Sequence, residues 1–341
     1  MPATLQTRKL GKNGPEIPAI GFGLMGMSGF YGPLDSDEER FKILDRAIEL
    51  GATNWDTADM YMDSEDLVGK WFKRTGKRNE VFLATKFGNK MDEKGNFTVS
   101  STGPYVREAW EKSSKRLGVD CFDLYYMHRT DGVTPIEETV EAMVKLKNEG
   151  KIKYLGLSEV SSATLRRACK IHHIAAVQME YSPFSIDIEH ESTSLLKTCR
   201  ELGVAVVAYS PLGRGMITNA YRSPADFDAS DFRRYLPRFS EENFPKNIKL
   251  VDGIVELAKK KGCTPSQLTL AWLLKQGNDI IPIPGTKKVK YLEENLGAAK
   301  VEISDEEEKQ VRKLVEDAEV VGDRYSEGSG GCLFGDTPER K

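Results

Sequence analysis

The sequence has few residues that could build a metal site or a disulfide framework. Its 341 residues include five cysteines and four histidines, and no CxxC pair occurs. Scattered cysteines of odd number are typical of reduced thiols. His172 and His173 are adjacent, and the single Cys169 before them is not part of a cysteine or histidine pair of zinc-site spacing. We therefore expect neither a metal site nor disulfides.

Long apolar runs and an excess of one charge are also absent. No segment approaches the roughly 20 apolar residues that span a bilayer, and the N-terminus lacks the apolar core of a signal peptide. The balance of 49 basic and 52 acidic residues gives a net charge of -3, which offers no basic surface to nucleic acid or anionic lipid. These absences predict a cytoplasmic protein without a membrane or nucleic-acid partner.

Short apolar runs recur along the chain, with amphipathic segments between them. Most are apolar at nearly every position, which is typical of parallel strands covered on both faces. The eight runs begin at Ala19, Thr53, Val81, Phe122, Ile152, Ala176, Val204 and Asp279. Helices are predicted over residues 36–50, 134–148, 161–172, 191–202 and 264–274, with Pro135 in the first helical position of the second.

Eight strands alternating with helices favour a closed (β/α)8 TIM barrel in a single domain, residues 1–341. An open doubly wound sheet is the alternative, but the glycines of GFGLMG (from Gly21) lack the following helix that a dinucleotide fold requires. The core is expected over about residues 7–318.

Three segments are expected outside the regular barrel. An N-terminal β-hairpin over residues 7–18, with its turn at Asn13-Gly14, would plug the barrel floor. A long loop on the C-terminal face, residues 213–245, is expected to be functional or mobile. The tail, residues 319–341, contains the glycine-rich segment 328–331 and is expected to be disordered or to fold over the site.

Ionisable side chains gather at the ends of neighbouring predicted strands, where barrels place their active sites. Lys86 lies inside an apolar strand and needs a partner, which Asp56 on the neighbouring strand supplies. The Lys86 cation would stabilise the phenolate of Tyr61 and lower its pKa from about 10, so Tyr61 becomes a better acid. His128 would orient a substrate oxygen. Because no side chain delivers hydride, this set requires a nicotinamide or a flavin.

Each of these four residues alone has a simpler explanation, as a cap, a core tyrosine or an architectural ion pair. Four of them at the mouths of consecutive strands are harder to explain as scaffold. We therefore predict that Asp56, Tyr61, Lys86 and His128 protonate a carbonyl oxygen.

The motifs around these residues resemble those of the aldo-keto reductase superfamily. They are NWDTADMY, FLATKFG, DLYYMHR, GKIKYLGLSE, VQMEYSPF, AYSPLGRG and PIPGTKKVKYLEEN. The resemblance extends from the hairpin to about Ala299 and is closest to the branch of pyridoxal reductases and perakine reductase. It implies an NADPH-dependent enzyme that reduces aldehydes or ketones, with Tyr61 as general acid for reduction and base for oxidation.

The resemblance also implies where NADPH binds. Ser158 and Gln178 would hold the nicotinamide amide, Tyr209 would stack on the ring, and the loop after it would wrap the pyrophosphate. The full set is Met25, Asp56, Ser158, Gln178, Tyr209, Ser210, Pro211, Leu212, Gly213, Arg214, Gly285, Thr286, Lys287, Lys288, Glu294 and Asn295. The two lysines beside Thr286 favour the 2′-phosphate of NADPH over NADH. Glu159 and Tyr291 stand where many relatives carry asparagine and arginine.

The predicted substrate pocket is apolar with one or two basic groups, which suits aromatic aldehydes or ketones as small-molecule partners. Its candidate residues are Tyr31, Met60, Arg129, Phe184 and Arg238. One alternative function is an NADPH-binding regulatory subunit with slow turnover, like the potassium-channel β-subunits. Another is a metal-dependent hydrolase or a phosphate-binding isomerase on the same barrel. The sequence leaves the oligomeric state open.

Overall fold

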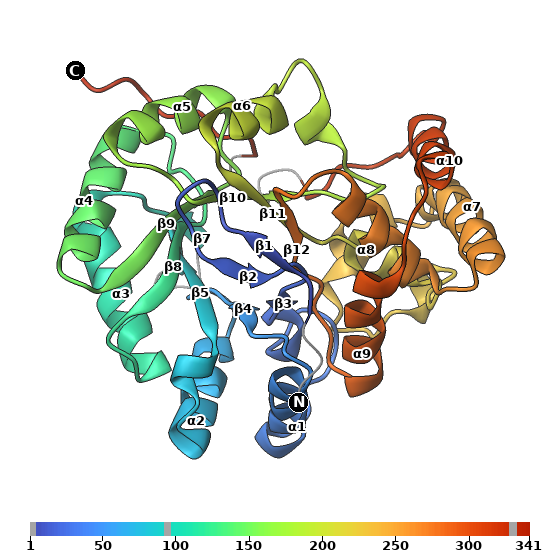
Figure 1. Ribbon diagram of the computed structural model, residues 1–341, viewed down its shortest axis with the longest axis horizontal. Coiled ribbons are helices and arrows are strands. Elements are labelled where there is room, and N and C mark those ends of the chain that lie inside the picture. Colours follow the sequence, from blue (N-terminus) through green and yellow to red (C-terminus); the bar gives the residue numbers. More distant parts are fainter. Residues whose placement is uncertain (1–4, 92–96, 327–332) are drawn as a thin grey trace.

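The computed structural model describes residues 5–91, 97–326 and 333–341. Eight parallel strands form one sheet in the order β12-β11-β10-β9-β8-β5-β4-β3 (Figure 1). Gly23 of β3 pairs with Gly285 beyond β12, and the Gly21 N–H donates to the Pro282 carbonyl at 2.9 Å, which closes the sheet. The strands are β3 Phe22–Gly23, β4 Asn54–Asp56, β5 Phe82–Phe87, β8 Phe122–Met127, β9 Ile152–Ser158, β10 Ala176–Glu180, β11 Ala205–Tyr209 and β12 Ile280–Pro282. The predicted barrel is confirmed.

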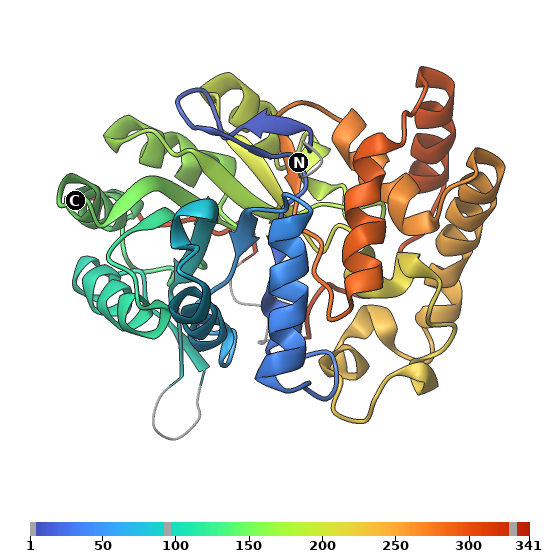
Figure 2. The same ribbon diagram turned by 60° about the horizontal axis from the view of Figure 1, so that its bottom comes forward.

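Helices cover the outside of the barrel, as Figure 2 shows for α1, which lies against the sheet. Ser36 accepts a hydrogen bond from the Glu39 N–H and caps α1. Thr264 and Gln267 form a capping box at α8. The helices are α1 Asp37–Glu49, α2 Ser64–Thr75, α3 Gly103–Leu117, α4 Ile136–Asn148, α5 Ser162–Ile171, α6 Leu195–Leu202, α7 Phe244–Lys261, α8 Pro265–Lys275, α9 Val289–Gly297 and α10 Asp305–Glu316.

Two predicted helix starts are wrong. Pro135 has extended ψ and is the N-cap of α4, so the helix begins one residue after the predicted position. The helix predicted from residue 191 begins at Leu195, because Ser194 adopts a left-handed conformation with φ 48°.

The N-terminal hairpin closes the floor of the barrel, as predicted. It pairs β1 Thr7–Lys9 with β2 Glu16–Pro18. Leu10 and Ile17 are 0% and 3% exposed and pack against the inward-facing residues of the strands. Arg8 donates to the carbonyls of Leu274 and Ile280, which fixes the hairpin to the end of α8 and the start of β12.

The long loop after β11 is mostly ordered into short 3-10 helices before α7 begins. These are η4 Gly213–Thr218, η5 Pro224–Asp226, η6 Phe232–Tyr235 and η7 Pro237–Phe239; the others are η1 Met25–Met27, η2 Arg78–Glu80, η3 Asp187–Glu189 and η8 Ala298–Lys300. A small ribbon of β6 Asn89–Met91 and β7 Phe97–Val99, which we did not predict, extends from the strand ends.

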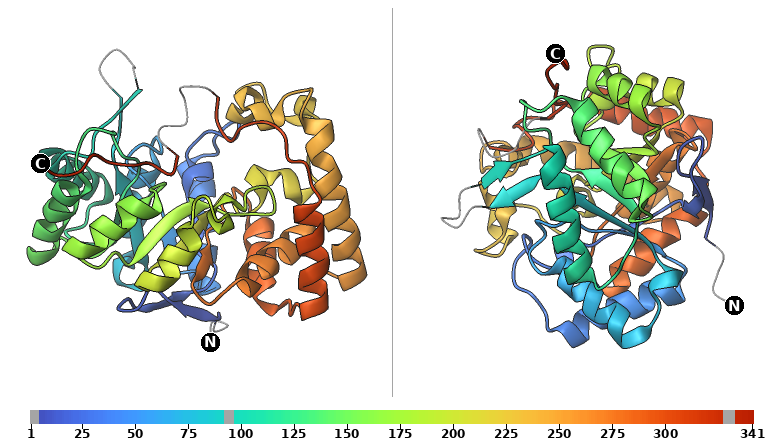
Figure 3. Two further views of the ribbon diagram at one scale, coloured as in Figure 1. Left: turned by 90° about the horizontal axis from the view of Figure 1, so that it is seen from above. Right: turned by 90° about the vertical axis from the view of Figure 1, so that its left-hand side faces the viewer.

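The C-terminal tail crosses the end of the barrel opposite the hairpin (Figure 3). Cys332 and the glycine-rich segment 328–331 lie outside the described residues. In the part of the chain that is described, no helix is long and apolar enough to cross a membrane.

Candidate active site

The four predicted catalytic residues meet at the C-terminal ends of β4, β5 and β8. The Lys86 ammonium is fully buried and donates to Asp56 Oδ1 at 2.5 Å and to the Thr57 carbonyl at 2.7 Å. It also lies 3.3 Å from the Tyr61 hydroxyl. The ring of His128 packs edge-on against that of Tyr61, with centroids 5.8 Å apart. Gln178 completes the set, because its Nε2 donates to Asp56 Oδ2 at 2.8 Å.

Burial and the Lys86 charge act in opposite directions on Tyr61. Burial is the larger effect and raises the pKa of Tyr61 above its ordinary value, while Lys86 opposes that rise. We predicted only the second effect. Burial disfavours charge on Lys86 as well, but Asp56 and Tyr61 raise the pKa of Lys86. At neutral pH the site therefore holds a protonated phenol beside an ammonium ion.

His128 is neutral in this environment. Burial lowers its pKa well below 6.5, and the cations Arg129 and Lys86 lower it further. Its Nδ1 is buried without a hydrogen-bond partner among the described residues. A neutral imidazole can donate one hydrogen bond to a substrate oxygen, which is the role predicted for it.

A cavity of about 520 Å³ opens beside Tyr61 and extends along the strand ends to the start of α9. Most predicted cofactor residues line it: Met25, Asp56, Gln178, Tyr209, Ser210, Pro211, Leu212, Arg214, Gly285, Thr286, Lys287, Lys288, Glu294 and Asn295. Ser158 and Gly213 do not. Ser158 is 1% exposed behind the cavity wall. Gly213 has φ 57°, and a Cβ there would lie 2.7 Å from the Phe184 ring.

The far end of the cavity offers several groups that suit an anion. Helix α9 begins directly after Thr286, Lys287 and Lys288, so its free N–H groups and positive dipole end lie there. The Lys287 ammonium donates to the carbonyls of Tyr31 and Pro33. Lys288 is exposed, and its ammonium lies 6.0 Å from the Tyr291 ring centroid. Tyr291 also lines the cavity.

The loop after β11 has a strained backbone where it lines the cavity. Ser210 and Arg214 adopt φ of 49° and 54°, values that non-glycine residues rarely take. Arg233 donates to the Arg214 carbonyl at 2.8 Å and is itself bound by both oxygens of Asp231. Such strain persists only when the surrounding contacts impose it, and it clusters at ligand sites.

Several lining residues were missed from the sequence. Tyr221 and Arg233 belong to the long loop, and Ser266 lies in the first turn of α8; all three face the cavity. The loop was expected to be functional, but nothing in its composition indicated which of its side chains face inward.

Of the predicted substrate residues, only Tyr31 lines the cavity. Phe184 is buried behind Gly213, and Met60 contacts the Asn89 amide through its sulfur. Arg238 donates to Ser185 Oγ at 3.0 Å. Arg129 is 7% exposed and lies beside His128.

The tail is bound to the strand ends through Glu159, a buried carboxylate. Arg324 donates to Glu159 Oε1 at 3.2 Å, and Tyr209 donates to the same oxygen at 2.8 Å. The backbone of Gly335 donates to the Glu159 carbonyl at 2.7 Å. The ring of Tyr325 lies 4.4 Å from the Arg214 guanidinium. Two predicted cofactor residues thus contact the tail: Arg214 donates to the Arg324 carbonyl at 2.8 Å, and the Tyr209 hydroxyl lies 3.4 Å from that of Tyr325.

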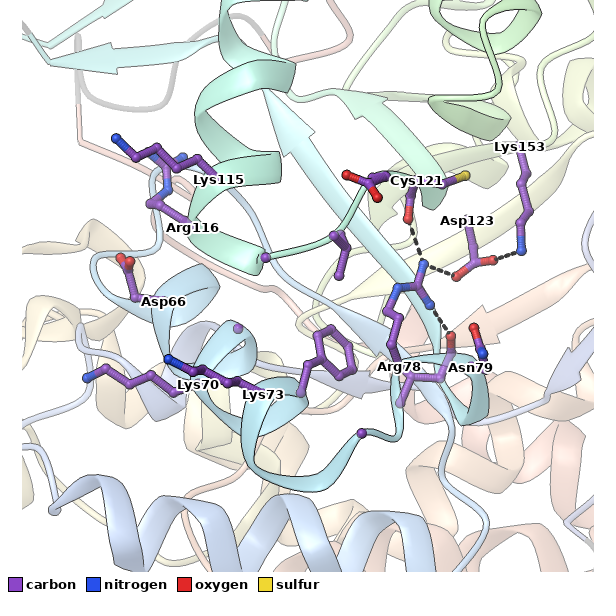
Figure 4. Close-up of a pocket in the computed structure, with 17 residues that line it drawn as sticks. Asp66, Lys70, Lys73, Arg78, Asn79, Lys115, Arg116, Cys121, Asp123 and Lys153 are labelled. Atoms are coloured by element: carbon purple, nitrogen blue, oxygen red, sulfur yellow. Dashed lines mark hydrogen bonds and ion pairs between the residues drawn. The ribbon is translucent and has the colours of Figure 1, made fainter.

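A second concave surface lies at the opposite end of the barrel, between the ends of α2 and α3 (Figure 4). Its volume is about 790 Å³, which exceeds that of the cavity beside Tyr61. Asp123 binds both Arg78 and Lys153 there, at 2.8 and 2.7 Å. Burial raises the pKa of Cys121, so its thiol is not activated. Asp123 is neutralised by its two partners here, and we assign no catalytic role to this groove.

The residues of the 520 Å³ cavity fit a phosphorylated dinucleotide. One end presents the half-buried phenol of Tyr61, the middle presents the Arg214 loop, and the other end presents Lys288 at a helix start. Glycines at positions 23, 26, 215 and 285 keep the wall free of side chains where a ligand must pass close to the backbone. In the described part of the chain, no group of three or more His, Cys, Asp or Glu residues could hold a metal ion.

Comparisons with known proteins agree with this geometry. The pattern of the Aldo/keto reductase family matches residues 19–316. The chain is 54% identical over 340 residues to Aldo-keto reductase str7 of Strobilurus tenacellus, covering 98% of both chains. It is 51% identical over 338 residues to Aldo-keto reductase yakc [NADP(+)] of Schizosaccharomyces pombe, again covering 98% of both.

Solved structures give the same result. A thermostable aldo-keto reductase in complex with the inhibitor epalrestat superposes with a TM-score of 0.72 at 32% identity, over 91% of this chain and 100% of that one. The glycerol dehydrogenase of Gluconobacter oxydans superposes with a TM-score of 0.81 at 26% identity, over 92% and 96%.

Replacing Arg324 with glutamine should release the tail from the barrel. Glu159 would keep its Tyr209 bond but lose its cation, and a buried carboxylate without a cation is costly. We expect hydrogen exchange of the backbone in residues 333–338 to quicken at least about tenfold. Arg340→Gln is the control, because its pair with Glu141 is exposed and contributes little. Equal exchange in both variants would contradict the role of Arg324.

Proposed function

The chain belongs to the aldo/keto reductase family, and we propose that Tyr61 is the general acid of its NADP-dependent carbonyl reduction. The observation that supports this most strongly is the buried chain of contacts from Asp56 through the Lys86 ammonium to the Tyr61 hydroxyl. No simpler structural role explains why a phenol should share a fully buried ammonium at the edge of a ligand cavity.

The bound nicotinamide supplies hydride to the carbonyl carbon. Tyr61 gives its proton to the carbonyl oxygen as negative charge develops there. The Lys86 ammonium stabilises the phenolate that remains, and Asp56 keeps that ammonium in place. Neutral His128 donates a hydrogen bond to the same oxygen. These groups act mainly on the transition state, because only there does the oxygen carry substantial negative charge.

We assign the 2′-phosphate of NADPH to the start of α9, with Lys288 as its main cation. Lys287 already donates to two carbonyls of the loop before α1, so its ammonium is occupied. Lys288 has no carboxylate or carbonyl acceptor for its ammonium among the described residues. Tyr291 beside it would stack on the adenine.

Within the family we propose that the chain belongs with the pyridoxal reductases and perakine reductase. The opening LGKNGPEIPAIGFGLMGMS and the GLSE end of β9 support this placement. The substrate would be a small carbonyl compound, and a panel of aldehydes that includes pyridoxal and 4-nitrobenzaldehyde, with NADPH and NADH at equal concentration, tests it directly. Oxidation of neither cofactor by any aldehyde would refute the proposed function.

Tyr61→Phe should remove most of the activity. General acid catalysis contributes about 100- to 10,000-fold, so kcat should fall by that factor. The dissociation constant of NADPH, measured by fluorescence titration, should change less than about twofold because the ring remains. Tyr235→Phe is the control, since Tyr235 is 73% exposed and should keep full activity. Undiminished turnover by Tyr61→Phe would refute the mechanism.

The pH dependence should reflect a phenol of raised pKa and a neutral histidine. Reduction requires protonated Tyr61, which is present below its raised pKa and lost above it. We expect kcat/KM for reduction to stay level from roughly pH 6 to 9 and to fall at higher pH. His128 should add no inflection near its ordinary value of 6.5. An inflection near that pH that disappears in His128→Asn would contradict a neutral imidazole.

Lys288→Met should weaken NADPH binding without affecting NADH. Loss of a charged hydrogen bond to phosphate should raise the dissociation constant of NADPH about tenfold or more. The matched control is Lys287→Met, which should alter the ratio of the two dissociation constants less, because its ammonium binds loop carbonyls. A larger loss of selectivity in Lys287→Met would reverse the assignment.

A further inference from the structure

Arg129 is a buried cation beside the catalytic residues that lacks an anionic partner. Its side chain follows His128 and is 7% exposed. Nη1 donates to the His128 carbonyl at 2.7 Å and to Ser158 Oγ at 3.2 Å, both neutral groups. Among the described residues, no carboxylate lies within the 4.0 Å of an ion pair with it.

The other buried cations of this region are all paired. Lys86 lies 2.5 Å from Asp56, Arg214 lies 3.1 Å from Glu180, and Arg324 lies 3.2 Å from Glu159. Arg238 shares Glu180 at 3.6 Å. Because burying a charge without a counter-ion costs several kcal/mol, the single exception requires a reason.

The part of the Arg129 guanidinium without a partner is its Nε–Nη2 edge, which can bind a carboxylate through two hydrogen bonds. Nε and Nη2 have no partner in the described chain, and neither is among its fully enclosed unpaired atoms, so both reach open space. These two N–H groups are parallel and match the two oxygens of a carboxylate. Nη1, which is bound to the strand ends, fixes the orientation of that edge.

Arg129 lies beside the proposed catalytic residues, because its Nη1 donates to the His128 carbonyl at 2.7 Å. Arg129 acts on the charge of both Tyr61 and His128, and it lowers the pKa of each. The Arg129 charge also interacts with the phenols of Tyr209 and Tyr325. A guanidinium near phenol rings suits an aromatic ligand that carries a negative group.

We propose that Arg129 binds a carboxylate of the substrate, and that the enzyme prefers aldehydes or ketones that carry one. This rests on the proposed function. In the reaction, the carbonyl carbon gains the hydride of NADPH and the oxygen gains the Tyr61 proton. NADP+ and an alcohol are released, solvent restores the Tyr61 proton, and the carboxylate is unchanged.

The first experiment compares each carboxybenzaldehyde isomer with its methyl ester, which has the same aldehyde without the charge. For at least one isomer, the wild-type enzyme should show kcat/KM at least about tenfold higher for the acid than for the ester. Arg129→Gln should bring that ratio to about one, because the KM for the acid rises more than the KM for the ester. Arg129→Lys keeps the charge but loses the paired N–H groups and should give an intermediate ratio.

The second experiment requires no turnover. Benzoate should bind the complex of the wild-type protein with NADPH in a calorimetric titration, and Arg129→Gln should weaken that binding at least about tenfold. The dissociation constant of NADPH should be equal in both proteins. If no aldehyde is reduced but benzoate binding depends on Arg129, the proposed function fails and the anion site stands.

Three results would overturn the proposal while leaving the reductase assignment intact. One is equal kcat/KM for acids and esters in the wild type. Another is an equal fall in kcat/KM for acid and ester in Arg129→Gln, which would indicate that Arg129 only stabilises the structure of the strand ends. The third is weaker NADPH binding in that variant with unchanged benzoate binding, which indicates a cofactor contact.

Discussion

A fully buried ammonium must have an anion beside it, and the site depends on how the barrel meets that need. Lys86 finds Asp56 because β4 and β5 are adjacent and in parallel register, with Asp56 opposite Ala84. The same ammonium reaches the Tyr61 hydroxyl, so the contact that makes Lys86 tolerable also places the acid. Gln178 binds the other Asp56 oxygen from β10, which fixes the carboxylate from across the barrel.

Burial gives the acid a property that sequence reasoning missed. The lysine beside Tyr61 suggested a lowered pKa, but desolvation is larger and the pKa is raised. Tyr61 therefore keeps its proton while the site is idle. The Lys86 cation stabilises Tyr61 mainly after the proton has left, because a phenolate without a nearby cation would be strongly disfavoured in that environment. The pair stabilises the end of proton transfer more than its beginning, as catalysis requires.

Local sequence patterns predicted the strands and the meeting of the proposed catalytic residues, but they did not predict contacts between residues far apart in the chain. Buried parallel strands are apolar throughout, and a barrel brings their polar ends together, so Asp56, Lys86 and His128 could be assembled from sequence. Arg324 and Glu159 are 165 residues apart, and no periodicity links them. The helix predicted from residue 191 failed at Ser194 because its left-handed backbone has no compositional signal.

The C-terminal tail affects whether Arg129 has an anionic partner. Glu159 is the carboxylate whose charge acts on the pKa of Arg129. Its side-chain oxygens, however, are bound by Arg324, Tyr209 and the Glu180 N–H. Without Arg324, Glu159 would lack its close cation, and the attraction between it and Arg129 would go unopposed. Arg324 of the tail therefore competes with Arg129 for the charge of Glu159. If Arg129 binds a substrate carboxylate as proposed, tail docking and substrate recognition are linked through the buried carboxylate of Glu159.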